Sequence, residues 1–196
     1  MAAFSPLVTR RTSIIFAVTA WLICHATAGG HGDLTKGFIS VPLDQSNLVI
    51  QKPYDVGVAD RSSFQNGVHT LWVYATDKPH SPSSHTNPRT EIRIAGYDYS
   101  SGVWQFEAFG YVPSNTSGVV VMQIFGAETH ATTLMMRVQD GALSYYRNPI
   151  YINGELKFEG SGRGGRSHFF KCGVYAQDDA SDYMESRWKH IKVLKK

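Results

Sequence analysis

Cysteine is scarce in this chain, with two residues in 196, Cys24 and Cys172. Cys24 lies in an N-terminal segment that we expect to be removed, so no intrachain disulfide could form and the fold must depend on its core. Excess charge is also small, because the formal net charge of +3 includes Arg10 and Arg11 of that segment and falls to +1 without them. Such a balanced composition gives no support to a nucleic-acid partner.

Motifs for metals and for several enzyme classes are absent too. The histidines are scattered, with His80 and His85 in a loop rich in Pro and Ser, and they lack the spacing of metal ligands. No serine stands in a G-x-S-x-G turn. Residues 160–165 match G-x-G-x-x-G, but a strand-like segment follows where a dinucleotide site needs a helix, so we predict a hairpin loop. We expect neither a metal nor a cofactor.

The N-terminus has the pattern of a secretory signal peptide. Two arginines precede an apolar run over residues 14–24, which leads into the small residues of 26–28. The run is shorter than the roughly 20 residues that span a bilayer. We therefore predict a signal peptide at residues 1–28, one domain at residues 29–196, and a vacuolar or extracellular location without membrane attachment after cleavage. A sequon predicts glycosylation at Asn115.

The remaining pattern is that of strands and turns. From residue 38 onward, short β-branched and aromatic runs alternate with Gly, Pro, Asn and Asp, which is typical of an all-β sandwich or jelly roll. Asp-Gly at 140–141 and Asn-Gly at 153–154 indicate hairpin turns. The stretch 77–88 indicates a loop. The basic C-terminal stretch indicates a final strand with a solvated face, and its lysines would also discourage aggregation if it lay at an exposed edge.

Three strand-like segments carry most of the information on function: residues 89–94, 123–125 and 170–177. Side chains alternate between the two faces of a strand, so the polar side chains of each segment share one face. If the segments line one concave sheet, these faces merge. The merged surface comprises Arg89, Glu91, Arg93, Gln123, Phe125, Lys171, Gly173, Tyr175 and Gln177. Three cations against one carboxylate predict a site for an anion rich in carboxylates.

An ion-pair ladder on an outer sheet face is the alternative for Arg89, Glu91 and Arg93 taken alone. The segment 170–177 argues against it, because it repeats the alternation and places Gly173 where a ligand could approach the sheet. Cys172 points to the opposite face, which predicts a buried and unreactive thiol.

These segments resemble the alginate-lyase-like family of polysaccharide lyases, and most of all the plant citrate-binding proteins that share its fold. The family typically carries an R-[ST]-E-x-R strand, a Q-I-[HV] strand and a Y-F-K-A-G-x-Y-x-Q strand. Further likeness lies in residues 51–55, 71–74, 97–107, 121–126 and 183–189. The resemblance spans almost the whole mature chain and implies a concanavalin-like jelly roll with a groove on its concave sheet.

The resemblance also implies roles for individual residues. In the lyases, an arginine, a glutamine and a histidine bind and neutralise a uronate carboxylate, and a tyrosine moves protons during β-elimination. Arg89, Gln123 and Tyr175 match three of these positions and would be the catalytic residues of a lyase. The histidine position is Phe125, which can neither donate a hydrogen bond nor act as a base, so lyase chemistry is weakened.

Binding a carboxylate demands less than catalysis, because preorganised cations suffice and arginine matches carboxylate geometry. We therefore hypothesise a non-catalytic, monomeric carboxylate-binding protein, with citrate as the ligand that the resemblance implies. In this hypothesis Glu91 holds the two arginines in place. The ligand-binding side chains are then Arg89, Arg93, Gln123, Lys171 and Tyr175. The alternatives are a lyase acting on acidic polysaccharide and a structural wall or storage protein.

One stretch departs from the family pattern. After Arg147 the relatives continue into a Trp-containing strand and its partner, whereas this chain passes through Asn148 and Pro149 directly to Ile150. We therefore expect one or two strands to be missing after Arg147. Such a loss would leave backbone edges of the sandwich unpaired.

Overall fold

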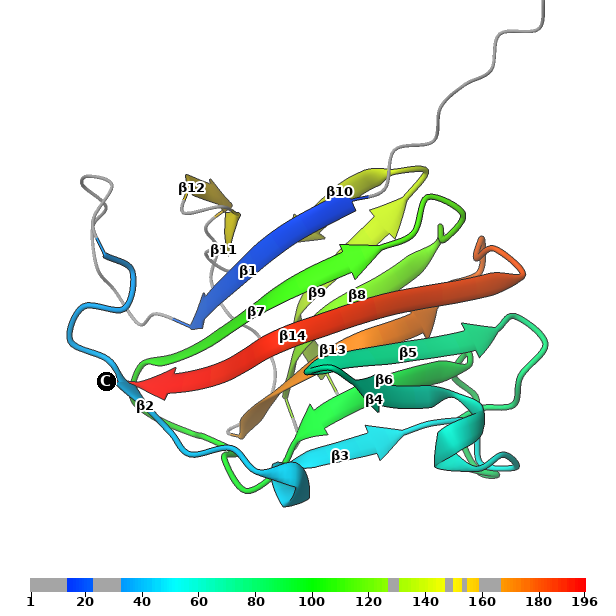
Figure 1. Ribbon diagram of the computed structural model, residues 1–196, viewed down its shortest axis with the longest axis horizontal. Coiled ribbons are helices and arrows are strands. Elements are labelled where there is room, and N and C mark those ends of the chain that lie inside the picture. The colour runs from blue at the N-terminus through cyan, green and yellow to red at the C-terminus, as the bar shows by residue number, and fades with distance from the viewer. Residues whose placement is uncertain (1–13, 23–32, 127–130, 147–149, 153–154, 159–166) are drawn as a thin grey trace, which may run out of the picture.

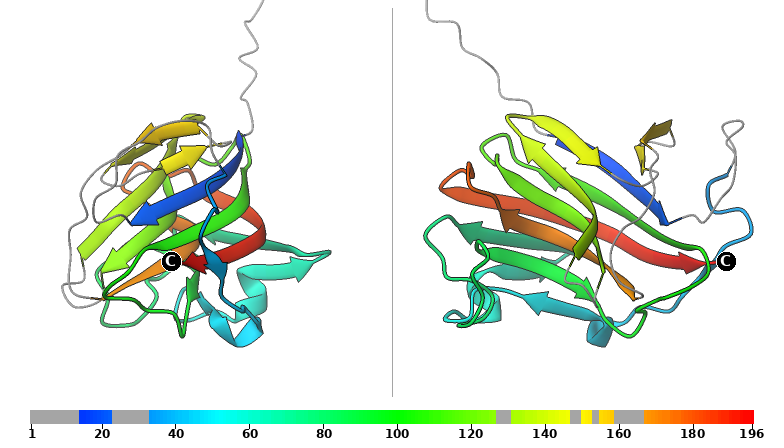
Figure 2. Two further views of the ribbon diagram at one scale, coloured as in Figure 1. Left: turned by 90° about the vertical axis from the view of Figure 1, so that its left-hand side faces the viewer. Right: turned by 180° about the vertical axis from the view of Figure 1, so that it is seen from behind.

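The computed structural model describes residues 14–22, 33–126, 131–146, 150–152, 155–158 and 167–196. In these ranges the chain forms two antiparallel sheets that pack into a sandwich, seen from three sides in Figures 1 and 2. The predicted all-β sandwich is confirmed. The described part contains no helix with the length and apolar character needed to cross a membrane.

Within the described residues, the first sheet has eight strands in the order β12-β11-β1-β7-β14-β5-β4, and β2 pairs with the end of β14. The bounds are β1 Ile14–Leu22, β2 Ile39–Ser40, β4 Ser62–Gln65, β5 Val68–Tyr74, β7 Trp104–Val112, β11 Ile150–Ile152, β12 Glu155–Phe158 and β14 Tyr183–Lys195. β14 lies between β7 and β5, so the last strand does not lie at an edge of this sheet. The predicted final strand with a solvated face is confirmed, since Lys189 and Lys192 of β14 are exposed, although they project from the middle of a sheet.

The second sheet has six strands among the described residues, in the order β10-β9-β8-β13-β6-β3. The bounds are β3 Leu48–Gln51, β6 Arg89–Ile94, β8 Val119–Gly126, β9 Ala131–Gln139, β10 Ala142–Tyr146 and β13 His168–Ala176. Two short 3-10 turns, η1 (Gln45–Asn47) and η2 (Val58–Asp60), flank β3 and β4. In the reverse view of Figure 2, β13, coloured orange, runs through the middle of this sheet.

The core fills the space between the sheets with alternate side chains of each strand. Phe106 of β7 lies 5.7 Å from Phe170 of β13 and 6.4 Å from Trp188 of β14, measured between ring centroids. All three rings are essentially inaccessible to water, and burial of each such side chain contributes about 1.5–3 kcal/mol. The Trp188 indole donates to Ser186 Oγ, which donates to the Gly173 carbonyl, both at 2.8 Å. This chain of bonds ties β14 to β13 across the sandwich.

One of the two predicted hairpin turns lies in the described residues, and its backbone has the predicted conformation. Asp140 and Gly141 join β9 to β10 with φ of 47° and 77°, the left-handed pair that Asp-Gly favours. A second hairpin, between β4 and β5, uses Asn66 and Gly67 with φ of 51° and 76°. The predicted turn at 153–154 and the predicted loop at 160–165 lie outside the described residues.

The strand beside β7 comes from an unexpected part of the chain. β1 pairs with β7 over nine residues, from Ile14 opposite Val112 to Leu22 opposite Trp104. Its other edge pairs with β11, where Val18 lies opposite Ile152. β1 belongs to the segment predicted to be a signal peptide, a prediction that the fold does not test. Removal of residues 1–28 would leave the outer edge of β7 without this partner.

Candidate anion-binding site

The three segments that the sequence singled out lie on adjacent strands of the six-stranded sheet, in the order β8, β13, β6. Lys171 of β13 is opposite Arg93 on one side and opposite Gln123 on the other. Farther along β13, Tyr175 is opposite Arg89. Residues paired across antiparallel strands share a face, so the predicted polar surface is assembled on one side of this sheet. The alternate residues of β6 point into the core, as the strand period requires.

Glu91 is the centre of this surface and is fully buried. It accepts from Lys171 Nζ at 2.8 Å and from Arg89 Nη1 at 3.4 Å, and Gln123 Nε2 also donates to it. The sequence-based expectation that Glu91 holds both arginines is therefore wrong. Arg93 pairs instead with Asp98, at 2.5 Å. Because Arg89 and Lys171 share one carboxylate, the described residues of the buried cluster carry one positive charge in excess.

Burial and charge act in opposite senses on the groups of this cluster. Burial by itself raises the pKa of Glu91, but Lys171 and Arg89 outweigh it and hold that pKa below its ordinary value. For Lys171, burial lowers the pKa and Arg89 lowers it further, while Glu91 raises it. Glu91 therefore stays ionised, and the ammonium of Lys171 would gain from a second negative charge nearby.

Arg89 is held in one orientation but keeps a free donor. Its guanidinium carbon lies 3.9 Å from the centroid of the Tyr175 ring, and Nη2 donates to Thr86 Oγ1 at 2.9 Å. Nε is buried and has no hydrogen-bond partner in the described part of the protein. Buried donors are rarely left unmet, so this atom is positioned to bind an acceptor from a ligand.

Aromatic rings form the side of the cluster near Lys171. Phe125 packs against Phe169 at 5.2 Å between centroids, and Lys171 Nζ lies 5.5 Å from the Phe125 ring. The guanidinium of Arg93 lies 4.1 Å from the Phe169 ring. Phe125 thus provides an apolar contact to a buried ammonium, and it supplies no group that could transfer a proton.

Gly173 has a role different from the predicted one. Its φ is +150°, and a Cβ at this position would lie 2.3 Å from the Thr90 carbonyl oxygen and 2.6 Å from the Glu91 Cα. The position that a Cβ would take is therefore occupied by the backbone of β6, which explains the glycine without a ligand. The glycine is needed for the close approach of β13 to β6, which brings Lys171 within reach of Glu91.

Two residues that the sequence did not assign to the site lie beside it. Gln51 of β3 is opposite Glu91, and its Oε1 is buried without a partner among the described residues. His80, from the loop 77–88, is near enough for the charges of Arg89, Lys171 and Glu91 to affect its pKa. Gln51 lies in a segment of family likeness, but neither residue belongs to a motif with a known role, so the sequence offered no signal of function.

Other predicted features are also located by the structure. Cys172 is buried, and burial raises the pKa of its thiol well above the ordinary value, as an unreactive cysteine requires. Gln177 lies beyond the end of β13, and its side-chain amide donates to the Ala176 carbonyl at 2.9 Å. Asn115 is exposed in a turn. In the described residues, no group of three or more His, Cys, Asp or Glu side chains could hold a metal ion.

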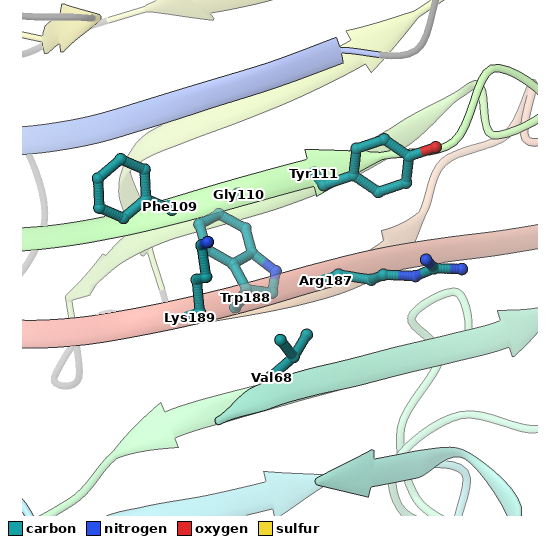
Figure 3. A pocket seen from close by; sticks show the side chains of 7 residues that line it. All are labelled: Val68, Phe109, Gly110, Tyr111, Arg187, Trp188 and Lys189. Carbon is teal, nitrogen blue, oxygen red and sulfur yellow. The ribbon is translucent and has the colours of Figure 1, made fainter. Parts of the chain in front are cut away.

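A separate hollow of about 350 Å³ lies on the outer face of the eight-stranded sheet (Figure 3). Its lining residues are Val68, Phe109, Gly110, Tyr111, Arg187, Trp188 and Lys189. The Arg187 guanidinium lies 5.4 Å from the Tyr111 ring, and Lys189 Nζ lies 5.7 Å from the Phe109 ring. None of the predicted site residues borders this hollow, so it is distinct from the cluster around Glu91.

Comparison with known proteins identifies the family of this chain. The family described as Alginate lyase matches residues 41–150, more than half of the chain. The chain belongs to this family. It is 49% identical over 189 residues to the citrate-binding protein of Hevea brasiliensis, a match that covers 83% of this chain and 79% of that protein. The predicted likeness to plant citrate-binding proteins is confirmed.

The fold is shared with a solved lyase. Alginate lyase A1-II′, a member of polysaccharide lyase family 7, superimposes with a TM-score of 0.51 at 16% identity, over 74% of this chain and 92% of the lyase. This likeness confirms the predicted jelly roll. At such low identity it concerns the fold alone.

The match to the Hevea protein also bears on the expected gap. The match runs over 189 residues but takes in only 83% of this 196-residue chain. Within the matched region, the Hevea protein therefore has residues without a counterpart in this chain. The family match ends at residue 150, beside the junction that follows Arg147. Neither match gives the position of the unmatched residues, so the expected loss after Arg147 stays a prediction.

Proposed function

We propose that the protein binds a small carboxylate, with citrate as the first candidate, and does not catalyse a reaction. The observation that carries the proposal is the buried excess of positive charge around Glu91. Arg89 is 6% exposed and Lys171 3% exposed, yet within the described ranges Glu91 is the one carboxylate that pairs with both. Arg89 Nε adds a buried donor without a partner.

The physical argument concerns desolvation. Removing a cation from water carries a penalty of several kcal/mol unless an anion and further hydrogen bonds compensate it. One carboxylate cannot compensate two buried cations. A bound carboxylate would supply the second negative charge and accept from Arg89 Nε, and a guanidinium suits carboxylate geometry. The similarity to a protein named for citrate binding supports this choice of ligand.

A lyase acting on acidic polysaccharide is the second candidate. It is favoured by the contact between Tyr175 and Arg89, because a phenol beside a carboxylate-binding arginine could move a proton from the carbon next to that carboxylate. Phe125 weighs against it, since the ring cannot help to neutralise that carboxylate in the transition state. A structural wall or storage role remains the third candidate and requires no ligand at all.

Thermal unfolding of the purified full chain, with citrate or an oligouronate added, tests the three candidates. Citrate at about 100 times its dissociation constant should stabilise the protein by about 2.7 kcal/mol, and hence raise the midpoint by about 5–11 °C. The Arg89→Gln variant should lose this shift. Arg187→Gln, which removes an arginine from the other sheet, should keep it.

The other outcomes identify the alternatives. Absorbance from an unsaturated sugar product with the oligouronate would establish a lyase. A midpoint that neither ligand moves would overturn the binding proposal and favour a structural role.

We further propose that the protein is a monomer of the secretory pathway, vacuolar or extracellular, glycosylated at Asn115. The apolar run at 14–24 and the exposure of Asn115 support this route. Sequencing the N-terminus of the protein from plant cells should find residue 29 first. Asn115→Gln should remove the mass of one glycan, and sedimentation should give the mass of one chain. An intact N-terminus or an unchanged mass would contradict the respective part.

A further inference from the structure

The loop 77–88 is fastened to the sandwich at several points. Asp77 forms an ion pair with Arg61 at 2.6 Å, and the Pro79 carbonyl accepts from the backbone N–H of Tyr54 at 3.0 Å. Near its end, Thr86 Oγ1 accepts from Arg89 at 2.9 Å. The contacts of Asp77 and Pro79 hold the two positions on either side of residue 78, and His80 follows Pro79 directly. The position of His80 relative to β6 is therefore set by bonds outside its own side chain.

His80 is partly buried, and one atom of its imidazole is a polar atom without a partner among the described residues. Nδ1 is buried and has no hydrogen-bond partner in the described ranges. The charged groups that act on the ring come from two strands: Arg89 and Glu91 of β6 and Lys171 of β13. His80 thus lies at the margin of the buried cluster described above.

Unmet buried polar atoms are concentrated at this margin. His80 Nδ1, Arg89 Nε and Gln51 Oε1 are all buried without a partner in the described residues, and each belongs to a side chain beside Glu91 or its partners. Because buried polar atoms are usually paired, these three atoms are available to the polar groups of a ligand. A carboxylate ligand could meet the donors among them.

We propose that His80 contacts the bound ligand and takes up a proton when a carboxylate binds. The inference rests on the proposed function, since it concerns the same ligand and the same site. Burial and the neighbouring cations favour the neutral ring in the free protein, and in the complex the ring becomes a further cation that faces the ligand. His80 is then a ligand-binding residue that makes affinity depend on pH.

The direction of this dependence follows from the charges. In the free protein, burial lowers the pKa of His80. The charges of Arg89 and Lys171 lower this pKa further, and the charge of Glu91 raises it. A polyanionic ligand adds negative charge and raises this pKa in the complex. At pH values between the pKa of His80 in the free protein and its pKa in the complex, the complex binds more protons than the free protein. The affinity for the ligand therefore increases as pH falls through this range. Glu91, with its depressed pKa, remains ionised there.

Calorimetric titration of the full chain with citrate, from about pH 8 to about pH 5.5, tests the inference across the usual range of histidine titration. The wild-type protein is compared with His80→Gln and with His85→Gln, a matched change in the same loop. Citrate also titrates in this range, but its own protonation is common to all three proteins and cancels in the comparison. Relative to His80→Gln, the wild type should gain about tenfold in affinity as pH falls, which corresponds to one pKa unit of coupling. His85→Gln should follow the wild type.

Each other outcome has a definite meaning. Parallel pH profiles for wild type and His80→Gln would overturn the role of His80 and leave the proposed function standing. No citrate binding by any of the proteins, at any pH, would refute both. Should His80→Gln fail to fold, NMR titration of the His80 ring in the wild type decides the matter: its pKa should rise when citrate is added, and an unchanged value would overturn the inference.

Discussion

Glu91→Gln gives the most direct test of the charged cluster. The substitution keeps the size of the side chain but removes the carboxylate that Lys171 and Arg89 share, at distances of 2.8 and 3.4 Å. Both cations are themselves buried, as is the side chain that is replaced. The variant should therefore contain two buried positive charges without an opposing charge in contact.

The expected destabilisation can be estimated from this geometry. Removing one partner of a buried ion pair costs about 3–5 kcal/mol, because the other partner is left uncompensated. For a domain of this size, each kcal/mol lowers the melting midpoint by about 2–4 °C, so the loss should be about 6–20 °C. A carboxylate ligand would replace the missing charge. Citrate should therefore stabilise Glu91→Gln more than it stabilises the wild type.

Differential scanning calorimetry with and without citrate measures both effects. Glu185→Gln is the matched control: Glu185 is also nearly buried and pairs with Arg187 at 2.6 Å, but the Arg187 side chain is 50% exposed. Loss of such a pair should change stability by less than about 1 kcal/mol, since water can solvate the remaining charge. Equal midpoints for Glu91→Gln and Glu185→Gln would refute the reasoning.

Three further predictions concern the fold. Gly173→Ala should destabilise the protein by more than the roughly 1–3 kcal/mol that a strained backbone costs by itself, because the new Cβ would lie 2.3 Å from the Thr90 carbonyl oxygen. Urea unfolding measures the loss. Gly67→Ala is the control, since Gly67 also has a positive φ, 76°, but a Cβ there would meet open space. Burial lowers the pKa of His69 and His168, so the unfolded chain binds protons first and the free energy of unfolding should fall as pH drops below about 6.5. Urea midpoints of a double His-to-Gln variant should show a weaker decline, and an equal decline would contradict this. In the uncleaved chain, which keeps residues 1–28, Val18→Pro should interrupt β1, lower stability and promote association through the β7 edge, as seen by sedimentation. An unchanged protein would contradict the pairing of β1 with β7 in that chain.

Features that depend on one strand or one turn could be predicted from the sequence. The alternation in 89–94 determines that Arg89, Glu91 and Arg93 share a face, because the two-residue period is a property of the extended backbone. The Asp-Gly hairpin at 140–141 follows equally from local φ preferences. Cys172 was assigned to the opposite face by the same period, and it is buried.

The partners of these side chains were decided by the register between strands. Glu91 lies opposite Gly173 and reaches Lys171, 80 residues away in the chain, whereas Arg93, two residues away, pairs with Asp98. A strand pattern does not specify which residues of another strand lie opposite it, because register is set by packing and turns over the whole sheet. The wrong pairing of Glu91 in the sequence-based hypothesis has this origin.

What the sequence determined by itself is therefore the class of fold, the faces of the site strands and the chemical types of the side chains that line the site. Tertiary structure alone decided that Arg89 and Lys171 share one buried carboxylate, that Gly173 accommodates the backbone of β6, and that His80 lies beside the cluster. The first group depends on backbone periodicity within a few residues. The second depends on contacts between segments far apart in the chain, where burial removes water and makes each charge depend on its neighbours.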